Sequence, residues 1–363
     1  MEKNAKIFVA GHRGLVGSAI LTKLHEAGYT SLITRSHSEL DLTNQQATQD
    51  FFDAEEPEYV FLAAAFVGGI LANSHYRADF IFNNLAIQQN VIGESFRHGV
   101  KKLLFLGSSC IYPRLAPQPI REDALLTGPL EETNEPYAIA KIAGIKMCES
   151  FNEQYDTEYL SVMPTNLYGP NDNFDLQRSH LLPAILRKMH LAKLVGDGNF
   201  DAIRRDLSQH PIENLEVINP SDQQIREGLA YFGITPERLT LWGTGTPRRE
   251  MMWSLDMAEA SLFVMEQVSK EMLVGGHSTI SLANSHLNVG TGVEHTIAEI
   301  AEMVKREVGY EGEIAFDHEK PDGTPRKLLD VSRINALGWK AHTSLEEGIK
   351  KYYKWYLSSP CYN

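Results

Sequence analysis

The sequence predicts an α/β protein built on a doubly wound parallel sheet, and three observations carry that prediction. Short apolar runs without polar breaks recur in the first half of the chain, as expected for strands that are covered on both faces. Helix-forming runs alternate with them through roughly residue 170. The first apolar run leads into a glycine-rich turn and a helix, the opening unit of a dinucleotide fold. We therefore expect a Rossmann-type sheet with a smaller C-terminal α/β lobe that binds substrate.

Length and composition set the class of protein. The 363 residues are enough for a dinucleotide-binding domain over residues 1–175, to which some later segments return, and a second domain over residues 176–363. The net charge of −13 argues against a nucleic-acid or membrane-surface partner, since both attract clustered basic residues. Three cysteines are too few, and of odd number, for a disulfide framework. With no membrane-length apolar stretch and no signal-peptide pattern, the sequence favours a cytoplasmic protein.

The first strand, over Lys6–Ala10, ends at a loop with the spacing GxxGxxG rather than the standard GxGxxG. Small residues there let the backbone approach a pyrophosphate, and the N-terminus of the following helix attracts it. The alternative is an ordinary glycine turn. The loop residues expected to contact a dinucleotide are Gly11, His12, Arg13, Gly14, Leu15, Val16 and Gly17.

The second strand, over Ser31–Thr34, favours NADPH over NADH. It ends in Arg35 rather than in the acidic residue that binds a ribose 2′-hydroxyl, and Arg13 supplies a second guanidinium for a 2′-phosphate. Two solvated surface arginines are the alternative. Asp41 and Leu42 follow this strand and are expected to border the adenine.

The third strand, over Tyr59–Ala65, ends in small residues that allow a cofactor to lie close to the backbone. The run RADFIFNNLAIQQNVIGESFRHG then predicts a helix whose apolar stripe packs in the core or against a second copy of the chain.

The fourth strand, over Leu103–Leu106, runs straight into Gly107-Ser108-Ser109-Cys110. In open α/β sheets ligands bind just past the strand ends. We expect the cofactor to lie near Leu106, Gly107 and Ser109, and the Ser108 hydroxyl to hydrogen-bond a substrate oxygen.

Tyr137 and Lys141 are four residues apart in a helix-forming run, so both side chains project from one face. An ammonium beside a phenol favours the phenolate and lowers the pKa of the phenol from its ordinary value near 10. A carbonyl that faces Ser108 and Tyr137 can accept a hydride at carbon and a proton at oxygen.

The run LSVMPTNLYGPNDNF predicts a strand and a turn that lead into substrate contacts, and His180 opens the next helix. A histidine there is commonly a cap or a surface residue, but with the Cys110 thiol it makes a competent acid/base pair. Such a pair can invert carbons α to a ketone. The polar segment 193–240 is interpreted as an insertion, a short helical excursion on the surface.

Late in the chain, residues 241–250 predict a strand, a turn and a basic pair. Trp242 is a candidate to stack on a base or sugar and Arg249 to hold a diphosphate, with a core tryptophan and a salt-bridged arginine as the alternatives. HLNVGTG predicts another strand and turn, and KPDGTPRKLLDVS a loop able to close over a nucleotide. TSLEEGIKKYYKWYL predicts a terminal amphipathic helix.

Taken together, these motifs resemble the GDP-L-fucose synthase family of extended short-chain dehydrogenases/reductases over nearly the whole chain apart from the insertion. The shared stretches are the Gly11 loop, Ser108–Pro113, Asn134–Lys141, Pro164–Pro170, Trp242–Arg249 and Lys320–Lys327. The resemblance implies an enzyme, typically homodimeric, that epimerises C3 and C5 of GDP-4-keto-6-deoxy-D-mannose and then reduces C4 with NADP(H), giving GDP-L-fucose.

The resemblance also assigns roles by matching motif. Tyr137 is the proton donor to the C4 oxygen, Lys141 its partner and ribose ligand, and Ser108 the hydroxyl that orients the oxygen. Cys110 and His180 match the epimerisation base and acid, with His180 also beside the cofactor. The remaining matches are Pro164, Asn166 and Leu167 for the cofactor, and Lys188, Trp242, Arg249, Asp322 and Lys327 for the GDP-sugar.

The sequence departs from the family pattern at three places: Phe66 stands where a lysine or other polar residue is expected, Met251–Ser254 replaces an aromatic-Leu-His run, and the insertion lengthens the segment before Trp242. A C4 reductase of a related GDP-4-keto-heptose, with little epimerase activity, is therefore the alternative.

Three other classes fit the sequence less well. A sugar 4,6-dehydratase would carry Asp-Glu where Ser109-Cys110 stands, and a nucleotide-sugar 4-epimerase would need neither Cys110 nor His180. A non-catalytic NADPH-binding regulator would tend to lose Tyr137 or Lys141.

Overall fold

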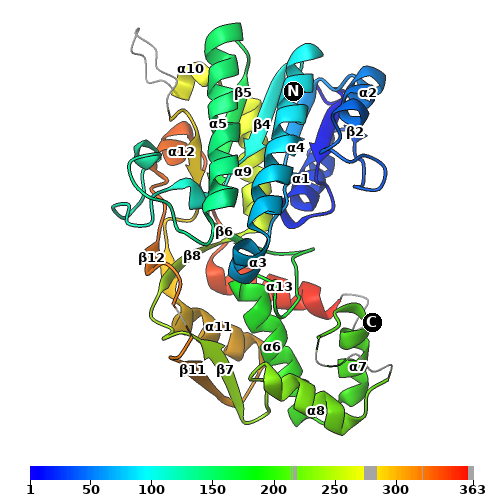
Figure 1. Cartoon of the computed structure of the whole chain (residues 1–363), viewed down its shortest axis with the longest axis vertical. Helices are drawn as coiled ribbons and strands as arrows, with labels where there is room; N and C mark the ends of the chain where they lie inside the picture. Colours follow the sequence, from blue (N-terminus) through cyan, green and yellow to red (C-terminus); the bar gives the residue numbers. More distant parts are fainter. Residues whose placement is uncertain (214, 216–218, 274–283, 321, 359–363) are drawn as a thin grey trace. The chain divides into compact units, whose positions relative to one another are not determined.

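A computed structural model describes residues 1–213, 215, 219–273, 284–320 and 322–358 of the chain, which folds into two compact units (Figure 1). The first unit comprises Met1–Leu167, Glu250–Val293 and Leu328–His342. The second comprises Tyr168–Arg249, Glu294–Lys327 and Thr343–Asn363. The chain passes between the units several times, and the domain limits expected from the sequence remain a prediction.

The first unit is built on a six-stranded sheet in the order β2-β1-β3-β4-β5-β9, in which every neighbouring pair is parallel. This order, with connections on both sides of β1, is the doubly wound arrangement that the sequence predicts. The strands are β1 (Ile7–Ala10), β2 (Leu32–Ile33), β3 (Tyr59–Leu62), β4 (Lys102–Leu106), β5 (Tyr159–Pro164) and β9 (Leu287–Val289).

Helices cover both faces of this sheet, which explains why its strands lack polar breaks. In β4, Leu103 and Phe105 join one buried cluster and Leu104 and Leu106 join the other, because successive side chains of a strand point to opposite faces. One face is covered by α2 (Gln45–Glu55), α4 (Arg77–Arg97) and α5 (Glu135–Tyr155). The other is covered by α1 (Leu15–Glu26), α9 (Ser254–Gln267) and α12 (Ser332–Leu337).

The shorter elements of the first unit lie mostly at its loops. They are α3 (Ile70–His75), the 3₁₀ turns η1 (Ser109–Ile111) and η2 (Glu122–Ala124), and α10 (Lys270–Leu273).

The second unit contains two small strand groups and five helices among its described residues. Strand β7 (Arg238–Trp242) pairs in parallel with β11 (Glu313–Asp317). The start of β8 (Arg248–Trp253) lies between β10 (Glu294–Thr296) and β12 (Arg326–Lys327), and β6 (Asn166–Tyr168) also pairs with β8. The helices are α6 (Leu181–Gly196), α7 (Phe200–Gln209), α8 (Asp222–Tyr231), α11 (Ile297–Val308) and α13 (Leu345–Leu357).

The predicted insertion is helical where the structure describes it, since it holds the end of α6 together with α7 and α8. A fully buried ion pair fastens it: the Arg187 guanidinium of α6 contacts Asp206 Oδ1 of α7 at 2.6 Å. Arg187 also donates to the carbonyls of Phe174 and His210. The insertion is therefore a packed part of its unit.

Among the described residues, no helix has the length and apolar character that crossing a membrane requires.

Candidate active site

Tyr137 and Lys141 lie one turn apart on α5, as their spacing predicts. Lys141 is 3% exposed, and its Nζ donates to the carbonyl oxygen of Leu106 at 2.7 Å. The same Nζ lies 4.8 Å from the ring centroid of Phe105 and 5.7 Å from that of Tyr137. The helix thus brings an ammonium beside the phenol, at the carboxyl end of β4.

The expected lowering of the Tyr137 pKa is wrong for this structure. Burial raises the pKa of the Tyr137 phenol well above its ordinary value, and the charge of a Cys110 thiolate raises it further. The Lys141 ammonium hydrogen-bonds Leu106, and burial lowers its own pKa to about 8. Tyr137 therefore holds its proton at neutral pH and is suited to donate it.

Ser108 and Cys110 belong to a tight turn directly after β4. Ser108 is the extended residue that caps η1, and its Oγ accepts a hydrogen bond from the Cys110 backbone N–H at 3.3 Å. In this contact the Ser108 hydroxyl oxygen is the acceptor, so its O–H can still donate a hydrogen bond to a substrate oxygen. Cys110 is partly exposed and forms no disulfide among the described residues. The turn brings its thiol into electrostatic contact with both Tyr137 and Lys141.

The glycine loop has the shape that a dinucleotide pyrophosphate needs. Gly11 has a φ of +84°, and a Cβ there would lie 2.7 Å from the backbone nitrogen of Ala64. A Cβ on Gly17 would lie 2.1 Å from the Gly11 carbonyl oxygen, so these two glycines serve close packing. Gly14 stands at the N-terminus of α1, where no side chain caps the described helix and no acidic residue occupies its first turn. The backbone there is open to an anion.

The two arginines expected near a 2′-phosphate differ in their surroundings. Arg13 is exposed. The Arg35 guanidinium pairs with Glu55, donates to the Thr34 carbonyl at 2.8 Å and lies over the Phe51 ring. Arg13 is thus the more available guanidinium, and the preference of this loop for a 2′-phosphate stays a prediction.

The remaining cofactor residues lie along the same side of the sheet. Burial and the neighbouring Arg13 charge lower the pKa of His12. Asp41 accepts hydrogen bonds from the N–H and hydroxyl of Thr43, which lower its pKa. Leu42 is buried. Pro164 is paired with Val289 of β9, and the Asn166 side chain donates to the Glu250 carbonyl at 2.9 Å.

His180 lies in the second unit, at the N-terminus of α6. Desolvation lowers its pKa, and the nearby positive charge of Lys327 lowers it further, so the neutral imidazole is favoured. Because Cys110 belongs to the first unit, the pairing of Cys110 with His180 stays a prediction.

Lys188 is buried on α6, which the sequence did not indicate. Its Nζ donates to the Phe232 carbonyl at 3.1 Å, and burial lowers its pKa to about 8. The side chain therefore packs against the insertion, and its predicted contact with a GDP-sugar is supported less well than those of Trp242 and Arg249.

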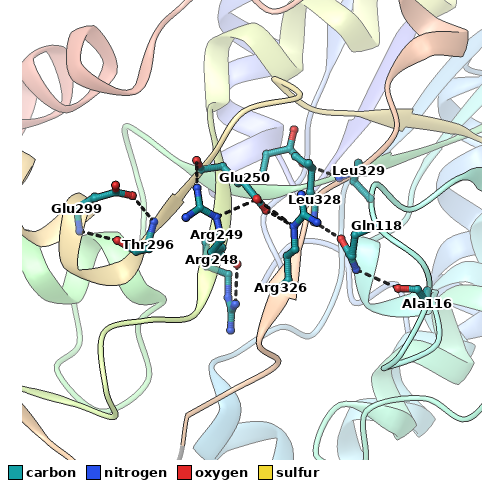
Figure 2. Close-up of polar contacts among 11 residues, drawn as sticks. Ala116, Gln118, Arg248, Arg249, Glu250, Thr296, Glu299, Arg326, Leu328 and Leu329 are labelled. Carbon is teal, nitrogen blue, oxygen red and sulfur yellow. Dashed lines mark hydrogen bonds and ion pairs between the residues drawn. The ribbon is translucent and has the colours of Figure 1, made fainter.

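The two arginines at the start of β8, Arg248 and Arg249, differ in their partners: within the described part of the chain, a carboxylate pairs with Arg248 but not with Arg249 (Figure 2). Arg248 and Arg326 both pair with Glu294, each at 2.9 Å. Arg249 donates to the Arg248 carbonyl at 2.8 Å, and no carboxylate contacts it among the described residues. Desolvation lowers the Arg249 pKa, and the negative charge of Asp322 opposes that fall. Arg249 is the arginine of the pair that can bind a phosphate.

Trp242, at the end of β7, is 54% exposed, and Lys320 Nζ lies 5.6 Å from its ring centroid. An exposed indole is available for stacking on a base. Asp322 accepts hydrogen bonds from the N–H and hydroxyl of Thr244, both at 2.8 Å, so it also ties its loop to the turn after β7.

Two groups near these residues were missed by sequence reasoning. Glu250 is completely buried on β8, and the signal for it was a charged residue within an otherwise apolar strand end. Phe80 of α4 lies between Phe66 and Tyr137, with ring centroids 4.9 Å and 6.3 Å away. No spacing rule connects those three aromatic residues in the sequence.

Comparison with known proteins agrees with this geometry. The family model described as "NAD dependent epimerase/dehydratase family" matches residues 7–206. A putative GDP-L-fucose synthase 2 from Arabidopsis thaliana is 50% identical, over 99% of this chain and 94% of that protein. A GDP-L-fucose synthase from Escherichia coli is 47% identical, over 98% of this chain and 97% of that protein.

Among solved structures, a GDP-D-glycero-L-gluco-heptose synthase from Campylobacter jejuni, in the presence of NADPH, superposes with a TM-score of 0.90. It is 42% identical, and the match covers 98% of this chain and 99% of that chain. The chain therefore belongs to the NAD dependent epimerase/dehydratase family and, within it, to the group of the GDP-L-fucose synthases.

Proposed function

We propose that the chain converts GDP-4-keto-6-deoxy-D-mannose to GDP-L-fucose, using NADPH, by inverting C3 and C5 and then reducing C4. The observation that carries the proposal is the grouping of Tyr137, Lys141 and Cys110 at the carboxyl end of β4, because it supplies acid/base groups for both steps. Relatives 50% and 47% identical that are named GDP-L-fucose synthases support the substrate.

In the epimerisation, the Cys110 thiolate removes a proton from a carbon next to the C4 ketone. The electron pair moves to the ketone oxygen, where the hydroxyls of Ser108 and Tyr137 stabilise the enolate charge. His180 returns a proton on the opposite face from its imidazolium form, which its lowered pKa makes a stronger acid, and the ketone is restored with inverted configuration.

NADPH, when held at the glycine loop, would supply the hydride for the reduction of C4. Tyr137 gives its proton to the C4 oxygen, for which its raised pKa suits it. The phenolate left behind lies beside the Lys141 ammonium, which stabilises the negative charge.

The residues of the glycine loop fit NADP(H). The uncapped N-terminus of α1 is open to the pyrophosphate, and the exposed Arg13 can pair with a 2′-phosphate. In the second unit, Arg249 would hold the diphosphate of GDP and the exposed Trp242 would stack on its base.

The protein acts as a cytoplasmic homodimer in this proposal. Large apolar side chains are exposed along α4 and α5, which pack against each other in the first unit. They are Phe82, Phe96, Ile139 and Tyr155. Phe96 and Tyr155 are in contact, and exposed apolar side chains on neighbouring helices are typical of an interface with another chain. The reducing compartment is supported by the small number of cysteines.

The alternative is a C4 reductase of a GDP-4-keto-heptose, favoured by the similarity to the heptose synthase and by Phe66. Phe66 is 42% exposed and its ring packs against Phe80, which in turn contacts Tyr137, so in this alternative Phe66 would meet the substituent at C5 or C6 of a sugar. The two functions are separated by measuring kcat/KM for the 6-deoxy-hexose and the heptose substrates through the loss of NADPH absorbance. The main proposal expects the 6-deoxy-hexose to react faster by tenfold or more, which corresponds to about 1.4 kcal/mol. A preference for the heptose would reverse the assignment.

A further inference from the structure

Glu250 is the best-connected buried carboxylate near the predicted ligand contacts of the first unit. Its Oε2 accepts from the backbone N–H of Leu329 at 3.0 Å, and its Oε1 accepts from that of Gly292 at 2.7 Å. Its own carbonyl oxygen accepts from the side chains of Thr165, at 3.2 Å, and Asn166, at 2.9 Å. Figure 2 shows the Leu329 contact, with the N–H of the adjacent Leu328 donating to Gln118.

The partners of Glu250 share one feature of chain position. The chain leaves the first unit after Leu167 and returns to it at Glu250. It leaves again after Val293 and returns at Leu328. Asn166, Gly292 and Leu329 each lie next to one of those residues. Three passages of the chain between the units therefore have their first-unit ends hydrogen-bonded to Glu250, and Glu250 is itself the first-unit end of a fourth.

The same passages carry predicted ligand contacts. The cofactor segment Pro164–Leu167 precedes the first passage, Arg249 precedes Glu250 directly, and Lys327 precedes the Leu328–Leu329 pair. Glu250 is thus hydrogen-bonded to Asn166, a predicted cofactor contact, and directly follows Arg249, a predicted GDP-sugar contact. It is also hydrogen-bonded to Leu329, two residues after Lys327, another predicted GDP-sugar contact.

The surroundings of the carboxylate supply hydrogen-bond donors, since Oε1 also accepts from the Thr291 hydroxyl at 3.4 Å. A Cβ on Gly290 would lie 2.2 Å from Glu250 Oε1, so the absence of a side chain there makes room for the carboxylate. Burial raises the pKa of Glu250, and the N–H groups of Leu329 and Gly292 oppose that rise. A glutamine would have the same shape, but its NH₂ would face one of those N–H groups and leave it without an acceptor.

We propose that Glu250 is a positioning residue that couples cofactor binding to GDP-sugar binding, by fixing the first-unit ends of the segments that carry both sets of contacts. The inference rests on the proposed function for the identity of the two ligands. By the reciprocity of coupling, GDP then changes the affinity for NADPH by the same factor as NADPH changes the affinity for GDP.

The test is a pair of titrations with the full chain. NADPH affinity is measured by calorimetry alone and in saturating GDP, for the wild type and for Glu250→Gln. The wild type is expected to show a coupling factor of about fivefold or more, and Glu250→Gln a factor near one, with each ligand alone bound within about threefold of wild type. With substrate, the variant is expected to raise the KM for the GDP-sugar more than it lowers kcat.

Glu122→Gln is the matched control, because Glu122 is also a buried carboxylate of the first unit that accepts a backbone N–H, from Asn288 at 3.0 Å. It is expected to lose stability and keep the coupling. No coupling in the wild type, coupling retained in Glu250→Gln, or an equal loss in Glu122→Gln would each overturn the proposal.

If Glu250→Gln does not fold, Thr165→Val is the second test, because it keeps the carboxylate and removes the Thr165 hydroxyl that donates to Glu250. A reduced coupling factor supports the proposal and an unchanged one overturns it. These titrations measure binding and need no turnover. An inactive wild type would therefore refute the proposed reaction, while the coupling between NADPH and GDP could still be measured.

Discussion

At the scale of single residues, the Tyr137 hydroxyl is the atom on which the reduction depends. Tyr137→Phe keeps the ring and its edge-on contact with Phe80 but removes the proton donor. Turnover is expected to fall by roughly 10²–10⁴-fold, as is typical of a lost general acid, while NADPH affinity is kept.

Tyr155→Phe is the control, since it removes a half-exposed hydroxyl near the end of the same helix. Stopped-flow measurement of NADPH oxidation distinguishes the two variants. Near-normal turnover in Tyr137→Phe would show that another group supplies the proton.

The pKa of Lys141 predicts in which direction the rate of reduction changes with pH. Its pKa is lowered to about 8, so the ammonium that stabilises the Tyr137 phenolate is present below that pH and is lost as the pH rises through it. The rate of reduction is therefore expected to decline on the alkaline side of about pH 8. Lys141→Arg keeps a positive charge throughout and should remove that decline while lowering the rate. A wild-type profile that stays flat into the alkaline range would contradict this role for Lys141.

Residue spacing predicted some of the site and not the rest. The four-residue interval of Tyr137 and Lys141 places them on one helix face because a helix repeats every 3.6 residues. The direction of the Tyr137 pKa shift was predicted wrongly, because burial depends on the packing of α4, β4 and η1 around the ring. Glu250 was missed for the same reason, since its partners are distant in sequence.

At the scale of elements, the strands of the first unit were predictable because their apolar runs are short and bounded by turn residues. The late strand predicted from HLNVGTG is confirmed as β9, which joins the sheet beside β5. Which strand it would pair with was not predictable, because parallel pairing depends on contacts between distant parts of the chain. The helices of the insertion were expected, but the buried Arg187–Asp206 pair that fastens them was not.

The helices α4 and α5 carry the prediction about assembly. Phe82 on α4 is 71% exposed, so Phe82→Glu is expected to leave the fold intact and to shift a homodimer toward monomer, because it places a charge in an apolar interface. Analytical ultracentrifugation measures the change. Leu115→Glu is the control, since Leu115 is 86% exposed on a loop away from both helices. A dimer that survives Phe82→Glu and dissociates in Leu115→Glu would place the interface elsewhere.

At the scale of the whole molecule, the two units contain different sets of candidate ligand contacts. The first holds the glycine loop and the Ser108, Cys110, Tyr137 and Lys141 side chains, and the second holds His180 and the candidate contacts to GDP. The sequence predicted two lobes with these contents. It also predicted that later segments return to the first domain, but not which segments they are, because no local pattern marks where a chain crosses from one packed unit to another.

The central claim is that one chain performs both inversion and reduction. The most direct measurement is to incubate the purified protein with NADPH and GDP-4-keto-6-deoxy-D-mannose in D₂O and to analyse the product by NMR. The account predicts GDP-L-fucose that carries deuterium at C3 and C5, because each inversion returns a solvent-derived proton to carbon. A C4-reduced product with the original configuration and no deuterium at those carbons would contradict it.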